Sequence, residues 1–240
     1  MVKRVFTDEE LMEMGVRTRD AVIKAVKAGD RGKAEKLINR LYKESQAIHD
    51  VYLDWIAELM DYVYVHSGEE ALYQVMRKVM GVLGQGFSES PDKIDFRSKV
   101  EMVAGTLRGH GCALEIEEDD EKVCVKMRPC GSGQKLVDSG AYKPPRNLSR
   151  LKPHVMTFGI PDFPIYCVHQ PVQSLLTIEK SGYPFDVVFP AKDMATESCR
   201  FCIYKDPDSI PEEVYTRVGM KKPKAGLKNP GKSKSVDNRT

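Results

Sequence analysis

The sequence lacks any apolar run long enough to span a membrane, and its first residues lack the apolar core of a secretory signal. From these absences we expect a cytoplasmic protein without membrane contact, in which the six cysteines stay reduced. The net charge is only +2, and basic residues are concentrated in the last twenty positions. The sequence also has no motif that reads a groove of nucleic acid. For both reasons we do not expect nucleic acid as a partner. No internal repeat is evident, which excludes a repeat architecture.

What is present is the composition of a folded protein, with 41% hydrophobic and 30% charged residues. A chain of 240 residues can bury an ample core in one large domain or two small ones. The segment 220–240 is rich in Lys, Pro, Gly and Ser and poor in large apolar residues. We expect it to be a disordered basic tail, which either keeps the protein in solution or binds nucleic acid or an anionic membrane.

The first 108 residues form a predicted helical region. Their apolar spacing and capping residues indicate helices at about 7–29, 30–66, 68–84 and 92–108. Four helices joined by short connections imply bundle-like packing. In the long second helix, apolar residues that include Ile48, Tyr52, Ile56 and Leu59 form the stripe expected to face the core.

The spacing of the apolar residues changes after residue 108, from the period of a helix to that of a strand. Alternating apolar residues on both sides of the acidic turn 117–121 predict a β-hairpin. Further strands are expected at 164–170, 184–189 and 199–205, with short helices at 171–180 and 211–219. We therefore predict an α+β protein whose helical half packs with a mostly antiparallel sheet carrying short helices. Residues 109–219 either form a second domain or share one with residues 1–108.

Cysteine and histidine are clustered in this second region. Cys167 and His169 are two residues apart on an expected strand, so both side chains would leave the same face. They suit two metal ligands, or a thiol with a base beside it. Cys199 and Cys202 have a C-x-x-C spacing, but a regular strand points them to opposite faces, so only one can join. The predicted zinc ligands are Cys130, Cys167, His169 and Cys199.

The stretch "PCGSG" raises a separate question about Cys130. Gly131 and Gly133 permit positive φ, so the backbone N–H groups of this turn, Ser132 included, are predicted to form an anion-binding nest. A thiol beside such a nest would be an activated nucleophile. Cys130 is thus a nucleophile, a metal ligand or a small residue packed at a tight corner, and the spacing leaves these three open.

The remaining candidates are dispersed. His49 lies beside the apolar stripe of the long helix, either as a core residue or as a general base or ligand in a crevice. Arg200 is a candidate for binding a carboxylate or phosphate. His110 needs only a capping role at a helix end. Cys112 and Cys124, like Cys202, are expected to be small buried strand residues.

The order "YCVH", "GYP", "VVFP" and "SCRFCIYKDP" is similar to the C-terminal half of the aminothiazoline-carboxylate hydrolase-like family. It also resembles the small-molecule-binding domain called 4-vinyl reductase. In both, one cysteine begins a short helical segment and a second begins a C-x-F strand, and the matching positions here are Cys167 and Cys199. The resemblance covers about residues 110–205. It implies an α+β ligand-binding fold, with hydrolysis of a small C–N or C–S compound as a possible activity.

Two functions remain in view. The first is a small-molecule hydrolase in which Cys130, His169 and His49 are candidate catalytic groups, with a thiol or a zinc ion driving the reaction. The second is a non-catalytic small-molecule sensor in which the same cysteines hold a structural metal. A redox or iron–sulfur protein is a third possibility. The substrate and the oligomeric state do not follow from the sequence.

Overall fold

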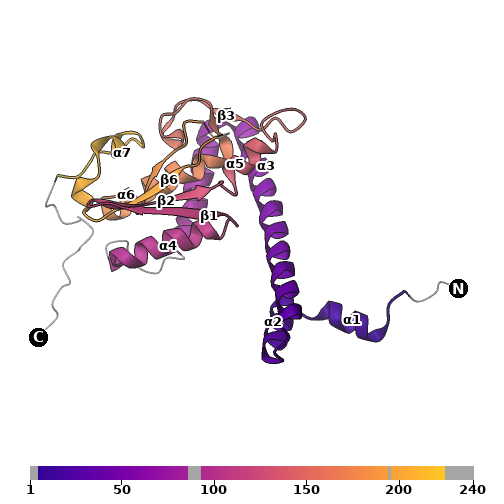
Figure 1. Cartoon of the computed structure of the whole chain (residues 1–240). Coiled ribbons are helices and arrows are strands. Elements are labelled where there is room, and N and C mark those ends of the chain that lie inside the picture. The colour runs from indigo at the N-terminus through magenta and orange to yellow at the C-terminus, as the bar shows by residue number, and fades with distance from the viewer. Residues whose placement is uncertain (1–4, 86–92, 194–195, 225–240) are drawn as a thin grey trace, which may run out of the picture. The chain divides into compact units, whose positions relative to one another are not determined.

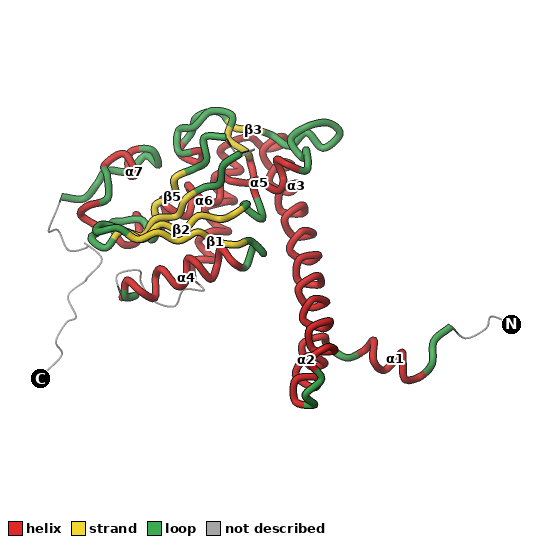
Figure 2. Tube along the Cα trace, in the orientation of Figure 1, coloured by secondary structure: helices red, strands yellow, loops and turns green. Residues whose placement is uncertain are grey.

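The computed structural model describes residues 5–85, 93–193 and 196–224. The chain forms two compact units, Met1–Tyr52 (unit 1) and Leu53–Thr240 (unit 2), which divide within one helix. The boundary expected near Gly109 falls inside unit 2. Figure 1 shows the elements along the chain, and Figure 2 shows how much of the segment between helices α5 (Gly133–Asp138) and α6 (His169–Ser181) is loop. The predicted tail lies outside the described residues from position 225 on.

Unit 1 is helical. It holds α1 (Asp8–Gly15), α2 (Thr18–Lys27) and the beginning of α3 (Arg31–Gln85). Thr7 caps α1 through a capping box, in which its hydroxyl accepts from the Glu10 N–H at 3.2 Å. The extended backbone of Val16 ends α1, so the single helix expected at 7–29 is two helices.

Helix α3 covers the second and third expected helices. Only Gly68 has non-helical dihedral angles within it, with φ 85° and ψ 177°, which any residue other than glycine adopts with difficulty. This break lies where the sequence predicted one helix to end and the next to begin.

The prediction of which apolar residues face the core is wrong for the part of α3 in unit 2. Leu53, Ala57 and Met60 are the buried positions there, whereas Ile56 and Leu59 are exposed. The helix is apolar on more than one side, so periodicity alone did not identify its buried face.

Unit 2 contains a four-stranded antiparallel sheet with the order β1–β2–β6–β5. Its strands are β1 (Ala113–Glu118), β2 (Lys122–Arg128), β5 (Val187–Phe189) and β6 (Arg200–Tyr204). Helix α4 (Phe96–Arg108) packs against β1, β2 and β6 (Figure 1). The α+β class and the β1–β2 hairpin are confirmed.

The smaller elements complete unit 2. They are α5 (Gly133–Asp138), β3 (Arg150–Leu151), η2 (Val155–Thr157), β4 (Phe163–Pro164), η3 (Ile165–Val168), α6 (His169–Ser181), η4 (Pro207–Ser209) and α7 (Glu212–Thr216). The core combines inward residues of β2 and β6 with buried residues of α3, α4 and α6, among them Val125, Ile203, Leu107, Leu72 and Val172.

The prediction of a strand at 164–170 is wrong. The chain forms a short strand only at Phe163–Pro164, then the 3₁₀ helix η3, and then α6 from His169. Pro171 lies in the first turn of α6, where a missing N–H has no cost. Cys167 and His169 therefore do not project from one face of a strand.

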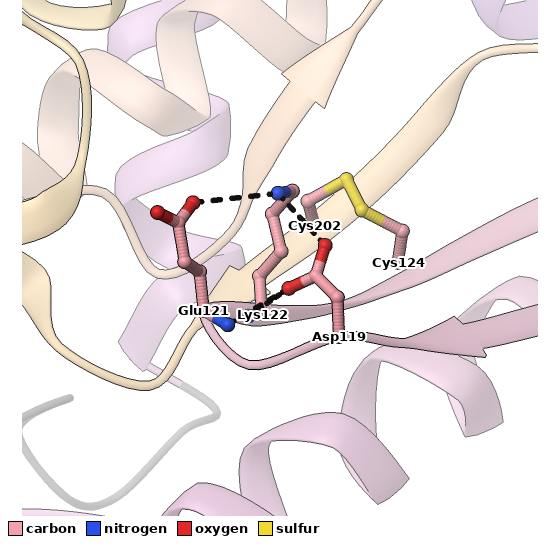
Figure 3. The surroundings of a disulfide bond; sticks show 5 residues. All are labelled: Asp119, Glu121, Lys122, Cys124 and Cys202. Carbon is pink, nitrogen blue, oxygen red and sulfur yellow. Dashed lines mark hydrogen bonds and ion pairs between the residues drawn. A yellow bond between two sulfur atoms is a disulfide. The ribbon is translucent and has the colours of Figure 1, made fainter.

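Two cysteines expected to be reduced are joined. Cys124 of β2 and Cys202 of β6 are register partners with Cα atoms 4.0 Å apart, and their sulfurs form a disulfide (Figure 3). The bond lies near the hairpin turn, where Lys122 Nζ is 3.0 Å from Asp119 Oδ2 and 3.7 Å from Glu121 Oε2 (Figure 3). The expectation that all six cysteines stay reduced is thus wrong for this structure.

Candidate functional site

Three cysteine side chains line one cavity of unit 2, which we call the thiol cavity. The cavity has a volume of about 510 Å³, and Cys130, Cys167 and Cys199 contribute to its wall. Cys130 follows β2, Cys167 lies in η3, and Cys199 immediately precedes β6. The structure therefore brings together three of the predicted ligands, and the fourth, His169, also lines the cavity.

Burial keeps the deeper thiols protonated. It raises the pKa of Cys167 well above its usual value, and the neighbouring Cys199 and Cys130 raise it further. Burial likewise raises the pKa of Cys199. Because only the thiolate is a strong nucleophile or metal ligand, Cys167 and Cys199 act at neutral pH as polarizable, uncharged wall groups.

The turn at Cys130 does not form the predicted nest. Neither Gly131 nor Gly133 has a positive φ. Gly131 serves another purpose, because a Cβ there would collide with the carbonyl oxygen of His110. The missing side chain lets the segment after β2 lie directly against the segment before β1.

A buried amide holds this turn in place. The backbone N–H of Cys130 donates to Gln134 Oε1 at 3.1 Å, and Ser198 Oγ donates to the same oxygen at 2.9 Å. Gln134 lies in α5 and is only 7% exposed. It therefore ties the turn that carries Cys130 to the segment that carries Cys199.

A serine–histidine pair lies at the same turn. Ser132 Oγ and His110 Nδ1 are 2.6 Å apart, and both residues line the thiol cavity. Ser132 is 5% exposed and is also hydrogen bonded to Tyr166. A nucleophilic hydroxyl within hydrogen-bond reach of an imidazole is the arrangement that activates serine.

Sequence reasoning missed this pair. His110 was assigned a capping role and Ser132 a place in the nest. The hairpin register contains the signal, because Ala113 pairs with Arg128 and the two chain segments beyond them leave the sheet side by side. Continued by three residues, that register brings His110 to Gly131 and hence beside Ser132.

His169 is neutral and held in one tautomer. Burial lowers its pKa. Its Nδ1 lies 2.7 Å from the Tyr166 carbonyl oxygen, which can only accept, so Nδ1 carries the proton. Nε2 then accepts from the Gln170 amide at 3.0 Å. The lone pair that a metal or a proton would need is therefore engaged.

The arginine in the thiol cavity wall is Arg150, not Arg200. Arg150 Nη1 donates to the Asp162 carbonyl at 3.1 Å, and its guanidinium lies 4.7 Å from the centre of the Tyr142 ring. Arg200 begins β6 and lies over the ring of Phe189, 5.5 Å from its centre. Arg200, the predicted anion-binding residue, is therefore not among the residues that line the thiol cavity, although it directly follows Cys199 in the chain.

His49 belongs to unit 1, whereas the thiol cavity belongs to unit 2. Its Nδ1 lies 3.2 Å from Asp50 Oδ1. Farther along α3, Asp54 and Glu58 bind Arg146 at 2.7 and 2.8 Å. These acids hold a loop of unit 2 against α3 and take no part in the cavity.

The part of the chain that the structure describes holds no preformed metal site. Among the described residues, no group of three or more His, Cys, Asp or Glu side chains is arranged to hold a metal ion. The predicted ligands Cys130, Cys167, His169 and Cys199 share one cavity, and Nε2 of His169 accepts a hydrogen bond from the Gln170 amide.

An apolar cavity of about 450 Å³ adjoins the thiol cavity. Leu107, His110, Gln170 and Phe201 line both, so these four residues form the wall between them. The apolar cavity is lined largely by residues of α3, α4 and α6. Among the described residues that line it, the one acid is Asp186, whose pKa burial raises to about 6. His110 thus faces a thiol-lined space on one side and an apolar space on the other.

Comparisons with protein-family models, with curated proteins and with solved structures find no match to this chain. The family resemblance of the second half stays a prediction. Within the part of the chain that the structure describes, none of the helices is long and apolar enough to cross a membrane.

Proposed function

We propose that unit 2 is a small-molecule hydrolase that cleaves a C–N or C–S bond in the thiol cavity, with Ser132 as nucleophile and His110 as its base. The observation that carries the proposal is the 2.6 Å contact between Ser132 Oγ and His110 Nδ1 in the wall of a cavity of about 510 Å³. A cavity of that size holds a small organic molecule.

The chemistry follows from this pair. Ser132 Oγ attacks the electrophilic carbon of the substrate while its proton passes to His110 Nδ1. The leaving amine or thiol takes that proton from His110 as the C–N or C–S bond breaks, which leaves an acylated Ser132. Water then attacks the acyl group, giving its proton to His110, and the released acid leaves a free serine that recovers the proton.

The other wall residues support binding. The protonated, polarizable thiols of Cys167 and Cys199 suit a sulfur-containing substrate better than a strongly polar one. Arg150, which is ion-paired with Asp162 Oδ2 at 3.3 Å, is a cation of the cavity wall that a substrate carboxylate could share. This substrate class agrees with the activity implied by the family resemblance.

The test uses a fluorophosphonate, which phosphonylates an activated serine and needs no knowledge of the substrate. We expect one label on the parent protein, located at Ser132 by peptide mass spectrometry and lost in Ser132→Ala. His110→Gln should slow labelling at least a hundredfold. Ser139→Ala is the matched control, because Ser139 Oγ donates only to the Leu136 carbonyl at 3.0 Å. A folded parent that takes no label would refute the proposal.

A second candidate is a non-catalytic small-molecule sensor in which zinc binds Cys130, Cys167 and Cys199. What favours it is that three thiols from separate segments share one cavity. Metal binding would deprotonate them, so zinc uptake should release protons. About one zinc per chain after a chelator wash, lost in Cys167→Ser, together with an unlabelled Ser132, would support the sensor over the hydrolase.

The proposal includes a cytoplasmic location. The Cys124–Cys202 disulfide is the observation against it, because disulfides are rare in a reducing cytosol. Quenching intact cells in acid and then alkylating the free thiols under denaturing conditions decides the matter, since a cytosolic protein should then show both cysteines alkylated.

A further inference from the structure

The apolar cavity beside the thiol cavity is a second space of a size that holds a ligand. Its volume is about 450 Å³, which is enough for a small organic molecule. Every residue of its wall belongs to unit 2, and α3 contributes only positions after Gly68. Large apolar side chains from three helices and one strand make up much of the wall, among them Met80, Met102, Leu176 and Phe201.

A single carboxyl group interrupts the apolar wall. It belongs to Asp186, the residue directly before β5 and the one acid among the described residues of the wall. Burial raises its pKa to about 6, and its own backbone N–H is the one group that opposes this effect. Because this pKa is still below 7, most of the carboxyl groups are ionised at neutral pH.

No other described residue forms an ion pair or a hydrogen bond with the Asp186 carboxylate. The further titratable groups of the described wall are His110 and Lys180. His110 Nδ1 is in contact with Ser132 Oγ at 2.6 Å. Lys180, in the last turn of α6, is exposed and makes no ion pair with Asp186. The chain thus places a negative charge in an apolar wall and supplies no cation for it from the described residues.

This combination of charge and apolar surface indicates the chemistry of the ligand. A carboxylate in apolar surroundings is unfavourable without a counter-ion, and it attracts a cation more strongly there than in water. An anionic ligand would be repelled, and an uncharged apolar ligand would leave the carboxylate uncompensated. A metal ion needs several oxygen ligands, whereas the described wall offers one carboxylate. The wall therefore fits a molecule with an apolar body and one ammonium group.

We propose that the apolar cavity is a binding site for a small organic amine, whose ammonium group pairs with Asp186 while its apolar body contacts α3, α4 and α6. The inference does not depend on the proposed hydrolase. Asp186 is not among the described residues that line the thiol cavity, and binding of an amine is measured without any reaction.

The test is isothermal titration calorimetry of the full chain at neutral pH with three probes of the same shape. These are phenylbutylamine, phenylbutanol and phenylbutyrate, which carry an ammonium, a hydroxyl and a carboxylate on the same apolar body. We expect the parent to bind the amine at least tenfold more tightly than the alcohol, and to bind the carboxylate least. Asp186→Asn should weaken binding of the amine at least tenfold and leave binding of the alcohol unchanged.

Asp162→Asn is the matched control, because Asp162 is an acid of the thiol cavity wall and does not line the apolar cavity. Its backbone has a positive φ of 55°, which asparagine also adopts readily. This variant should bind the amine as the parent does, and circular dichroism should show that both variants are folded. Three results would overturn the proposal: no binding of the amine at millimolar concentration, equal binding of amine and alcohol, or a loss of amine binding in Asp162→Asn but not in Asp186→Asn.

Discussion

Removing the Cys124–Cys202 disulfide should cost unit 2 several kcal/mol of stability. The bond joins the neighbouring strands β2 and β6 in the middle of the sheet, and Cys202 is 1% exposed. It connects residues 78 positions apart in the chain. Reduction therefore frees a long loop in the unfolded chain while leaving the strand pairing of the folded chain in place.

The magnitude follows from that loop. In the chain-entropy description, closing a loop of 78 residues removes entropy worth about 4.5 kcal/mol at 25 °C from the unfolded state. Residual structure in the reduced chain lowers this figure, so we expect a loss of about 2–4 kcal/mol in the free energy of unfolding. This is a large share of the stability of an ordinary domain.

The assay compares urea unfolding of the parent with that of the double variant Cys124→Ala, Cys202→Ala. Reduction of the parent with dithiothreitol should lower its stability to nearly that of the variant, while the variant should not respond. Cys112→Ala is the control, because Cys112 is a free cysteine. In the unfolded, unreduced parent, four of the six cysteines should react with a thiol reagent. Six reactive thiols, or a parent indifferent to dithiothreitol, would refute the reasoning.

Two further predictions concern Gly131, which lies between Cys130 and Ser132, and Asp186, which lines the apolar cavity. Gly131→Ala should destabilise unit 2 by about 1–3 kcal/mol, because the new methyl group meets the His110 carbonyl oxygen, whereas Gly105→Ala in α4 should be neutral or stabilising in the same thermal scans. Burial raises the pKa of Asp186 to about 6, so the folded state holds its proton more tightly than the unfolded state does. The contribution of Asp186 to stability should therefore be full below pH 4 and fall by up to about 3 kcal/mol between pH 4 and 6, and urea titrations should show that Asp186→Asn removes this fall.

The sheet could be predicted from the sequence where its pattern was local. Alternation on both sides of an acidic turn predicted the β1–β2 hairpin. The regular strand at 199–205 predicted that Cys199 and Cys202 would point to opposite faces. The structure contains the hairpin. It also places the two cysteines differently, because Cys202 is bonded to Cys124 whereas Cys199 lines the thiol cavity. Period-two patterns are decided by neighbouring residues, so no knowledge of the distant chain is needed.

The segment around Cys167 shows where such patterns fail. Its β-branched and aromatic residues favour a strand, and the prediction was a strand. The proline at 171 allows a helix to begin just before it, and tertiary packing against η2 selects the helical state. The prediction that Cys167 and His169 share one face failed with the strand, although both residues still reach the same cavity.

The serine–histidine pair depends on local structure and yet was not predicted. His110 and Ser132 are 22 residues apart, but the hairpin between them fixes their separation through its register. Counting outward from the paired residues Ala113 and Arg128 brings the two together once the hairpin register is assumed. The pair therefore needs only one hairpin and a glycine at position 131 to form, and not the assembly of distant elements that the thiols of the cavity require. For this reason, we expect a variant that destabilises α6 to displace Cys167 from the cavity, while Ser132 and His110 remain in contact.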